Sequence, residues 1–195
     1  MEARNSARYP LCVLLTPEAL ATIQACTAAA YDQQRSEWGG LLWGRLFVHP
    51  MKGMVPVIVA ATNGVCRATP TSCEILPASW QAGERELADQ RLGGLQCLGD
   101  FHSHPKMGVF MSGPDRLSFW SYGHVSHWLG MVVDPWRSDY GIFAKCSADR
   151  FERIPCFVMS HRIAQVLNLP RPVSGRLAGR GHLVSSQGGN HRAIR

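Results

Sequence analysis

Two histidines and an aspartate lie close together in one short stretch of this chain, GDFHSHPKMGVFMSGPD (residues 99–115). Because side chains alternate along a strand, His102 and His104 at the end of a predicted strand point to the same side. Ser112 and Asp115 open a predicted helix, where positions three apart share a face. Two imidazoles and one carboxylate are ligand types that zinc uses. Three protein ligands leave the fourth position to water, as in catalytic zinc sites.

Each part of this stretch also has a purely structural interpretation. A Ser-x-x-Asp segment such as Ser112–Asp115 is commonly a helix cap. A His-x-His pair is commonly a partly exposed pair on a strand. A strand that ends in His-x-His-Pro and is followed closely by Ser-x-x-Asp has little structural need for every member, and the combination favours a metal site.

The surrounding sequence predicts an α+β (mixed α/β) fold, because strands follow strands too often for a doubly wound sheet. Thr16-Pro17-Glu18 marks a helix start, with a capping residue, a proline in the first turn and an acid. Ser112 caps another helix. Strands are expected at 11–15, 41–48, 55–61, 72–76, 96–102, 128–133, 140–146 and 151–159, and helices at 17–34, 77–91 and 112–122.

Composition favours one globular domain, residues 1–169, followed by a tail, residues 170–195. The chain has 195 residues, 46% of them hydrophobic, and a net charge of +6. The tail is rich in Gly, Ser and Arg and has no acid, which predicts disorder. The positive charge is concentrated there, so an extended nucleic-acid surface on the fold is not expected. No apolar run is long enough for a signal peptide or a membrane span, and a cytoplasmic protein is expected.

The seven cysteines are an odd number without a Cys-x-x-Cys pair, which does not indicate a disulfide framework. Five of them are expected to be buried reduced thiols: Cys12, Cys26, Cys97, Cys146 and Cys156. Cys66 and Cys73 flank a turn-like segment, and pairing or metal binding stays open for these two.

Three separated segments together resemble the JAMM (JAB/MPN) zinc metalloprotease family, in particular its deubiquitinase-type and stand-alone bacterial members. His102-Ser103-His104-Pro105, six further residues and Ser112-Gly113-Pro114-Asp115 have the form of its metal signature. Glu37-x-x-Gly40-x-Leu42-x-Gly44 has the form of its upstream segment. Met131–Pro135 resembles a strand of the deubiquitinating members. The resemblance covers roughly residues 10–160 and implies a cytidine-deaminase-like fold with a curved, mostly antiparallel sheet flanked by helices.

The resemblance implies that His102, His104 and Asp115 bind Zn²⁺. It also implies that Glu37 acts as general base and then acid, and that Ser112 donates a hydrogen bond to the oxyanion. The bond cleaved would be the amide after the C-terminal glycine of a ubiquitin-like protein. Partners implied for stand-alone bacterial members are E1-like and E2-like proteins of ubiquitin-like conjugation operons, including antiviral defence operons.

The loop between the two parts of the metal signature resembles that of the proteasome-lid deubiquitinases. Its apolar residues Met107, Val109 and Phe110 would be costly to expose without a partner, which makes them candidate substrate contacts. The alternative is that Phe110 and Met111 pack into the core. Asp100, which has the same strand parity as His102, could orient a ligand imidazole or occupy a simple edge position.

Three other functions are considered on the sequence. The same chemistry could process a ubiquitin-like sulfur carrier. A non-catalytic MPN scaffold is disfavoured, because such members generally lose one or more of Glu37, His102, His104 and Asp115. Binding of nucleic acid through the arginine-rich tail would be weak and sensitive to salt.

Overall fold

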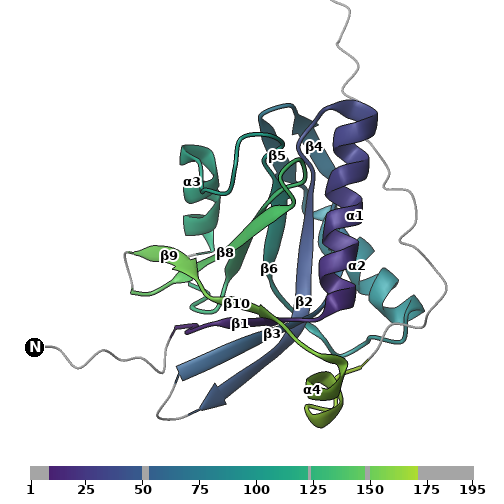
Figure 1. The fold of residues 1–195 in the computed structure, drawn as a ribbon, viewed down its shortest axis with the longest axis vertical. Coiled ribbons are helices and arrows are strands. Elements are labelled where there is room, and N and C mark those ends of the chain that lie inside the picture. Colours follow the sequence, from purple (N-terminus) through teal and green to yellow (C-terminus); the bar gives the residue numbers. More distant parts are fainter. Residues whose placement is uncertain (1–8, 50–52, 123, 148–149, 171–195) are drawn as a thin grey trace, which may run out of the picture.

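A computed structural model describes residues 9–49, 53–122, 124–147 and 150–170. One curved eight-stranded sheet forms the centre, with a long helix along it and shorter helices around it (Figure 1). The elements are β1 (Val13–Leu15), α1 (Pro17–Gln34), β2 (Gly39–His49), β3 (Gly53–Asn63), β4 (Cys66–Thr69), β5 (Ser72–Ile75), α2 (Ala78–Asp89), β6 (Gln96–Ser103), α3 (Gly113–Ser121), β7 (Leu129–Asp134), β8 (Asp139–Lys145), β9 (Phe151–Ile154), β10 (Cys156–Val158) and α4 (His161–Val166).

The sheet is mixed, with the strand order β10-β1-β3-β2-β6-β7-β8-β9. Four of its seven neighbouring pairs are antiparallel (β3–β2, β2–β6, β7–β8 and β8–β9) and three are parallel. Its two outer strands, β9 and β10, are separated in the chain by Pro155 alone. The sheet must therefore curl until its edges approach each other, which gives it a nearly barrel-like form. The prediction of a mixed α/β fold is confirmed; the cytidine-deaminase-like architecture stays a prediction.

Helix α1 begins and ends where the local sequence dictates. The Thr16 hydroxyl accepts a hydrogen bond from the Ala19 amide (3.3 Å), and Pro17 occupies the first turn. The helix ends at Arg35, whose backbone is left-handed (φ 54°). Its buried side, including Ile23, packs against the sheet in a core of aliphatic and aromatic side chains. The end of α1 leads directly into Glu37 and β2.

The glycines of the Glu37 segment allow β2 to lie close to its neighbours. A Cβ added to Gly40 would collide with the carbonyl oxygen of Thr62, and one added to Gly44 would collide with that of Val57. Gly40 also faces the ring of Phe101 on β6. The spacing of these glycines is therefore explained by packing of β2 between β3 and β6.

Two parts of the sequence prediction are corrected. The strand expected over 151–159 is divided by Pro155, which has no amide hydrogen to donate, into β9 and β10, and α4 follows. The short strand β4, not predicted, pairs with β5 in a separate two-stranded sheet.

All seven cysteines are free thiols; Cys66 is buried and the other six are half-buried rather than fully buried. The predicted tail lies, from residue 171 onward, outside the described residues. In the described part of the chain, no helix has the length and apolarity to cross a bilayer.

Candidate metal centre

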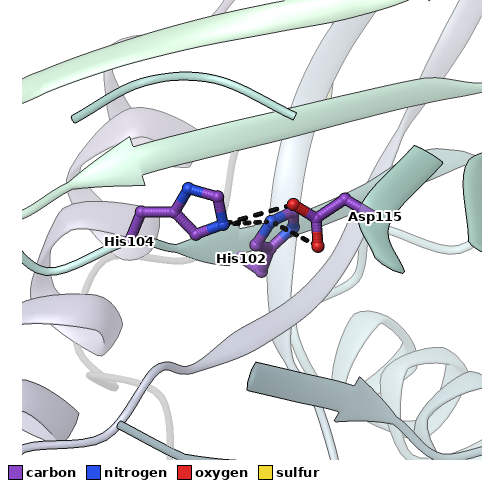
Figure 2. A group of neighbouring side chains, drawn as sticks. All are labelled: His102, His104 and Asp115. Atoms are coloured by element: carbon purple, nitrogen blue, oxygen red, sulfur yellow. Dashed lines mark hydrogen bonds and ion pairs between the residues drawn. The ribbon is translucent and has the colours of Figure 1, made fainter. Parts of the chain in front are cut away.

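Strand β6 and helix α3 bring the three candidate ligands together. Nε2 of His102 lies 3.2 Å from Nε2 of His104. The Asp115 carboxylate lies 3.4 Å from the first nitrogen through Oδ1 and 3.3 Å from the second through Oδ2. Both imidazoles turn the same ring nitrogen toward this carboxylate (Figure 2). The structure therefore brings together the three side chains that the sequence predicted to lie close together.

A capping box at the start of α3 fixes the direction of Asp115. Its Oδ2 accepts a hydrogen bond from the Ser112 amide (2.7 Å), and its own amide donates to the Ser112 hydroxyl (3.3 Å). Burial would raise the pKa of Asp115, but hydrogen bonds from the two imidazoles outweigh it and hold the pKa well below its usual range. The structural and the functional interpretation of Ser112-x-x-Asp115 are thus compatible, because the cap aims the carboxylate at the histidines.

These donors fit a metal cation. The three ligand atoms lie within 4.8 Å of one another, and among the residues that the structure describes no other such trio of His, Cys, Asp or Glu is found. Two ring nitrogens 3.2 Å apart cannot both carry a proton directed at the other. Burial would lower the pKa of His102, yet the Asp115 carboxylate outweighs this and raises it. The trio therefore favours positive charge at its centre, which a bound cation supplies.

Glu37 lies beside this trio with an unsatisfied carboxylate. Its Oε1 is 4.0 Å from Nε2 of His104, its side chain is 2% exposed, and this oxygen has no hydrogen-bond partner among the described residues. Burial raises the pKa of Glu37 to about 7, against the lowering effect of the two histidines. A buried polar atom without a partner is rare, so its presence here indicates a position kept for a group that arrives with the metal or the substrate.

Ser103 holds Glu37 in this place. The Ser103 hydroxyl accepts a hydrogen bond from the Trp38 amide (2.9 Å), and the Ser103 amide donates to the Trp38 carbonyl (2.8 Å). The Glu37 amide donates to the Thr69 carbonyl at the end of β4 (2.8 Å). Ser103 is fully buried between the two histidines. The sequence analysis assigned it no role, although its position within His-Ser-His was the available signal.

Comparisons with known proteins identify the family and support the fold. The family described as prokaryotic homologs of the JAB domain matches residues 20–140, more than half of the chain. The chain belongs to this family. Among solved structures, it is similar to protein DSY2949 from Desulfitobacterium hafniense, with 16% identity, a TM-score of 0.56 and coverage of 76% of this chain and 94% of that one. That likeness supports the fold alone. No curated protein matches this chain.

In this JAB domain, Asp134 holds the loop that lies between His104 and Asp115. The buried Asp134 carboxylate accepts hydrogen bonds from the amides of Lys106 (3.0 Å) and Gly108 (2.9 Å). It also accepts from the Trp136 amide (3.0 Å) and from the Arg137 guanidinium (2.7 Å). The loop after His104 is thereby joined to the β7–β8 turn. This explains physically why an aspartate ends the Met131–Asp134 segment.

The three loop residues predicted to bind substrate have different environments. Met107 and Phe110 are exposed, whereas Val109 is half-buried and packs against the core cluster that contains Phe143. The Phe110 ring lies 4.8 Å from the His104 ring, so it covers one side of that ligand. Met111 is buried, as the alternative interpretation expected. Met107 and Phe110 can meet a partner in this conformation; Val109 supports the loop from beneath.

Asp100 does not contact the ligands in the way considered for it. Its carboxylate accepts a hydrogen bond from the Trp128 indole (3.0 Å), and in the described part of the chain no hydrogen bond joins it to His102. Burial raises the pKa of Asp100 to about 6, with the nearby His102 and the indole acting in the opposite direction. The expectation that it orients an imidazole has no contact to support it.

Proposed function

We propose that this protein is a zinc-dependent peptidase of the isopeptidase type that cleaves the amide after the C-terminal glycine of a ubiquitin-like protein. The observation that carries the proposal is the unpartnered Oε1 of Glu37, buried 4.0 Å from the ligand nitrogen of His104. A structural carboxylate in that position would be satisfied by hydrogen bonds, as Asp134 is. A general base needs a free oxygen directed at the reacting centre.

His102, His104 and Asp115 would bind the zinc ion through the atoms that already converge. Zinc supplies Lewis-acid activation of water and of the amide carbonyl. Three protein ligands are the number found in catalytic rather than structural zinc sites. The capping box at Ser112 keeps the carboxylate directed at the imidazoles during turnover.

The acid–base work is assigned to Glu37. Its carboxylate takes a proton from the attacking water and gives it to the leaving amine, so the amide C–N bond breaks as water adds across it. A general base is most effective when its pKa lies near the working pH, and burial brings that of Glu37 to about 7. The Ser112 hydroxyl accepts from the Asp115 amide, and its own proton stays available to donate to the developing oxyanion.

An extended glycine-ending tail fits the surroundings of Glu37. The two-stranded β4–β5 sheet ends at Thr69, whose carbonyl is bonded to the Glu37 amide. Its outer backbone is a site where an extended chain can add as a strand. In the loop after His104, Met107 and Phe110 offer exposed apolar contacts. Two features of the proposal stay predictions: E1-like and E2-like partners, and a role in antiviral defence. The alternative substrate, a ubiquitin-like sulfur carrier, also stays a prediction, because its processing would use the same chemistry.

Cleavage of defined conjugates by zinc-loaded protein tests the proposal. The substrates are ubiquitin and several bacterial ubiquitin-like proteins, each joined through its C-terminal glycine to the lysine amine of a fluorescent peptide. We expect release of the peptide from at least one, with zinc bound near one ion per chain. Protein that binds zinc and leaves every conjugate intact, at micromolar concentration over hours, would contradict the assignment.

A further inference from the structure

Five exposed or half-buried side chains form a second group at the edge of the metal centre: Tyr31, Arg35, Lys106, Trp136 and Arg137. We call it the cation–aromatic cluster. The ring centroids of Tyr31 and Trp136 lie 6.4 Å apart, edge to face. Nζ of Lys106 lies 4.3 Å from the Trp136 ring and 5.7 Å from the Tyr31 ring. The Arg35 guanidinium lies 4.7 Å from the Tyr31 ring.

The cluster is attached to the catalytic residues through the chain itself. Lys106 is two residues after the ligand His104, and Arg35 is two residues before Glu37. The end of α1 supplies Tyr31 and Arg35, and the β7–β8 turn supplies Trp136 and Arg137 (Figure 1). A substrate chain that extends from the metal centre toward Lys106 and Arg35 would meet these side chains.

The backbone under the cluster is strained and is held by hydrogen bonds, which indicates that its shape is not accidental. Lys106 has a left-handed backbone (φ 67°), which is unfavourable for a non-glycine residue. The Asp134 carboxylate holds it there by accepting from the Lys106 amide, and the Arg137 guanidinium donates to the Lys106 carbonyl (2.9 Å). Strained backbone is found preferentially at binding and catalytic sites.

Two of the three cations have no carboxylate partner among the residues that the structure describes. Arg137 is paired with Asp134 (2.7 Å). Neither Lys106 nor Arg35 lies within 4.0 Å of an acidic oxygen in the described ranges of the chain. Both lie against the ring of Tyr31, and both act on its hydroxyl, whose pKa they lower. Trp136, against which Lys106 rests, is 62% exposed. An exposed tryptophan under an unpaired ammonium group is typical of an interaction surface rather than of a packing contact.

We propose that the cation–aromatic cluster binds acidic side chains of the protein substrate, next to the amide that is cleaved. A glutamate can place its carboxylate between Lys106 and Arg35 while its methylene groups pack on Trp136. The inference rests on the proposed function, because it assigns a sequence preference to that peptidase. A nucleic acid is the weaker candidate, since its repeated phosphates need a longer row of cations than these two.

Binding is tested first, without catalysis, on the zinc-loaded protein. The probes are the peptides acetyl-GEEKEEG-amide and acetyl-GQQKQQG-amide, and the readout is the indole N–H resonance of Trp136, assigned with Trp136→Phe. We expect the Glu peptide to shift this resonance and to bind about five- to tenfold more tightly than the Gln peptide, with weaker binding at high salt. The double variant Lys106→Gln/Arg35→Gln should lose that difference.

Arg162→Gln is the matched control, because Arg162 is an exposed cation on α4 at the opposite end of the molecule (Figure 1). It should bind both peptides as the wild type does. Equal binding of the Glu and Gln peptides by wild type would overturn the proposal, as would an unchanged preference in the double variant. Tighter binding of a dT10 oligonucleotide than of the Glu peptide, at the same resonance, would also overturn it.

Cleavage then separates this inference from the proposed function. The same two peptides are joined through lysine to whichever ubiquitin-like protein the peptidase releases, and KM is expected to be lower for the Glu conjugate with kcat similar. If no conjugate is cleaved but the Glu peptide still binds at Trp136, the proposed function fails while the acidic-ligand site stands. If both conjugates are cleaved with equal KM and the peptides bind equally, the cluster assignment alone is wrong.

Discussion

Glu37 and Asp115 are two carboxylates that approach the same imidazole, His104, from different elements and in opposite states. Asp115 is fully engaged, with both imidazole nitrogens at 3.3 and 3.4 Å and the Ser112 amide at 2.7 Å. Glu37 is more deeply buried, yet its Oε1 has no hydrogen-bond partner. The pKa of Asp115 is held well below its usual range and that of Glu37 is raised to about 7. Under the proposed function, the same functional group would serve as a ligand or as a base according to which donors surround it.

The difference arises from how each residue reaches the centre. Asp115 is aimed by its own helix cap, so the donors that lower its pKa are local. Among the described residues, the hydrogen bonds that fix Glu37 are made by backbone atoms: its own amide donates to the Thr69 carbonyl, and the amide of the neighbouring Trp38 donates to the Ser103 hydroxyl. The position of its side chain is therefore set without a hydrogen-bond donor on Oε1. The predictions below change one side of this comparison at a time.

Removal of a ligand should have the largest effect. His104→Ala takes away the imidazole that both carboxylates share, and we expect it to lose bound zinc and to reduce cleavage to background. Metal analysis of purified protein, with turnover measured on the same sample, checks this. Arg162→Gln serves as the control and should keep both. If the His104 variant retains a full equivalent of zinc, the ligand assignment is wrong.

Glu37→Gln should distinguish the role of Glu37 from that of Asp115. Turnover is expected to fall by ~10²-fold or more, the scale of a lost general base, while zinc content stays at the wild-type level. The metal-free variant should melt no lower than metal-free wild type, because a neutral amide replaces a buried carboxylate whose Oε1 has no hydrogen-bond partner among the described residues. Calorimetry and metal analysis accompany the kinetics. Near wild-type turnover at equal zinc content would refute the role of Glu37 and leave the metal site intact.

Ser103→Ala tests whether backbone anchoring positions the base. The variant leaves the Trp38 amide without its buried acceptor, and we expect a loss of stability of about 1–3 kcal/mol. Turnover should fall about tenfold with zinc retained, and Ser103→Thr, which keeps the hydroxyl, should restore most of it. A variant that is destabilised but cleaves normally would show that Ser103 acts on stability alone.

Asp134 extends the comparison to a third carboxylate, which is buried. It is held by several hydrogen bonds, and none of its described partners is a histidine. Burial would raise its pKa, but the hydrogen bonds from the Lys106 amide, Arg137 and the Gly108 amide outweigh this and lower the pKa. A depressed folded-state pKa stabilises the protein above the unfolded value of about 3.9, and this contribution is lost as pH falls through the folded-state value. Asp134→Asn should therefore melt below wild type at pH 7, with a gap that narrows in acid.

This smallest of the four effects is best measured by thermal melting of metal-free proteins from pH 7 to pH 3, so that release of zinc does not contribute. Turnover at pH 7 should change by only a few-fold, since Asp134 touches the loop and not the reacting atoms. A gap that widens as the pH falls would contradict the assigned direction of the pKa.

Local patterns in the sequence were enough to predict the three candidate ligands. The features that the sequence analysis missed depend on contacts between residues far apart in the chain. His102, His104 and Asp115 are joined by strand alternation, a short loop and a helix cap, all of which can be recognised within one stretch. Glu37 came only from a family resemblance, because nothing near it indicates catalysis. The role of Ser103 was missed, since its partners are backbone atoms of Trp38, sixty-five residues away.

The same division applies to the fold. The long helix α1 was predicted with its bounds from its Thr16 cap and Pro17. Strand β4 was missed, because a four-residue strand that pairs only with β5 needs little apolar periodicity. Val109 could not be distinguished from its exposed neighbours Met107 and Phe110, since its burial depends on contact with Gly141, far along the chain.

The closure of the sheet at Pro155 also sets an order of assembly during synthesis. Val13 on β1 pairs with Cys156 on β10, across a chain separation of 143 residues. His102 and Asp115, in contrast, are thirteen residues apart. Contacts between distant residues close late, because a longer loop must be ordered before they form. The nascent chain therefore has its three candidate metal ligands available while one side of β1 is still unpaired. A ribosome that stalls before residue 156 would release a protein able to gather its ligands yet lacking the strand that seals the sheet, and such a chain exposes an edge prone to aggregation.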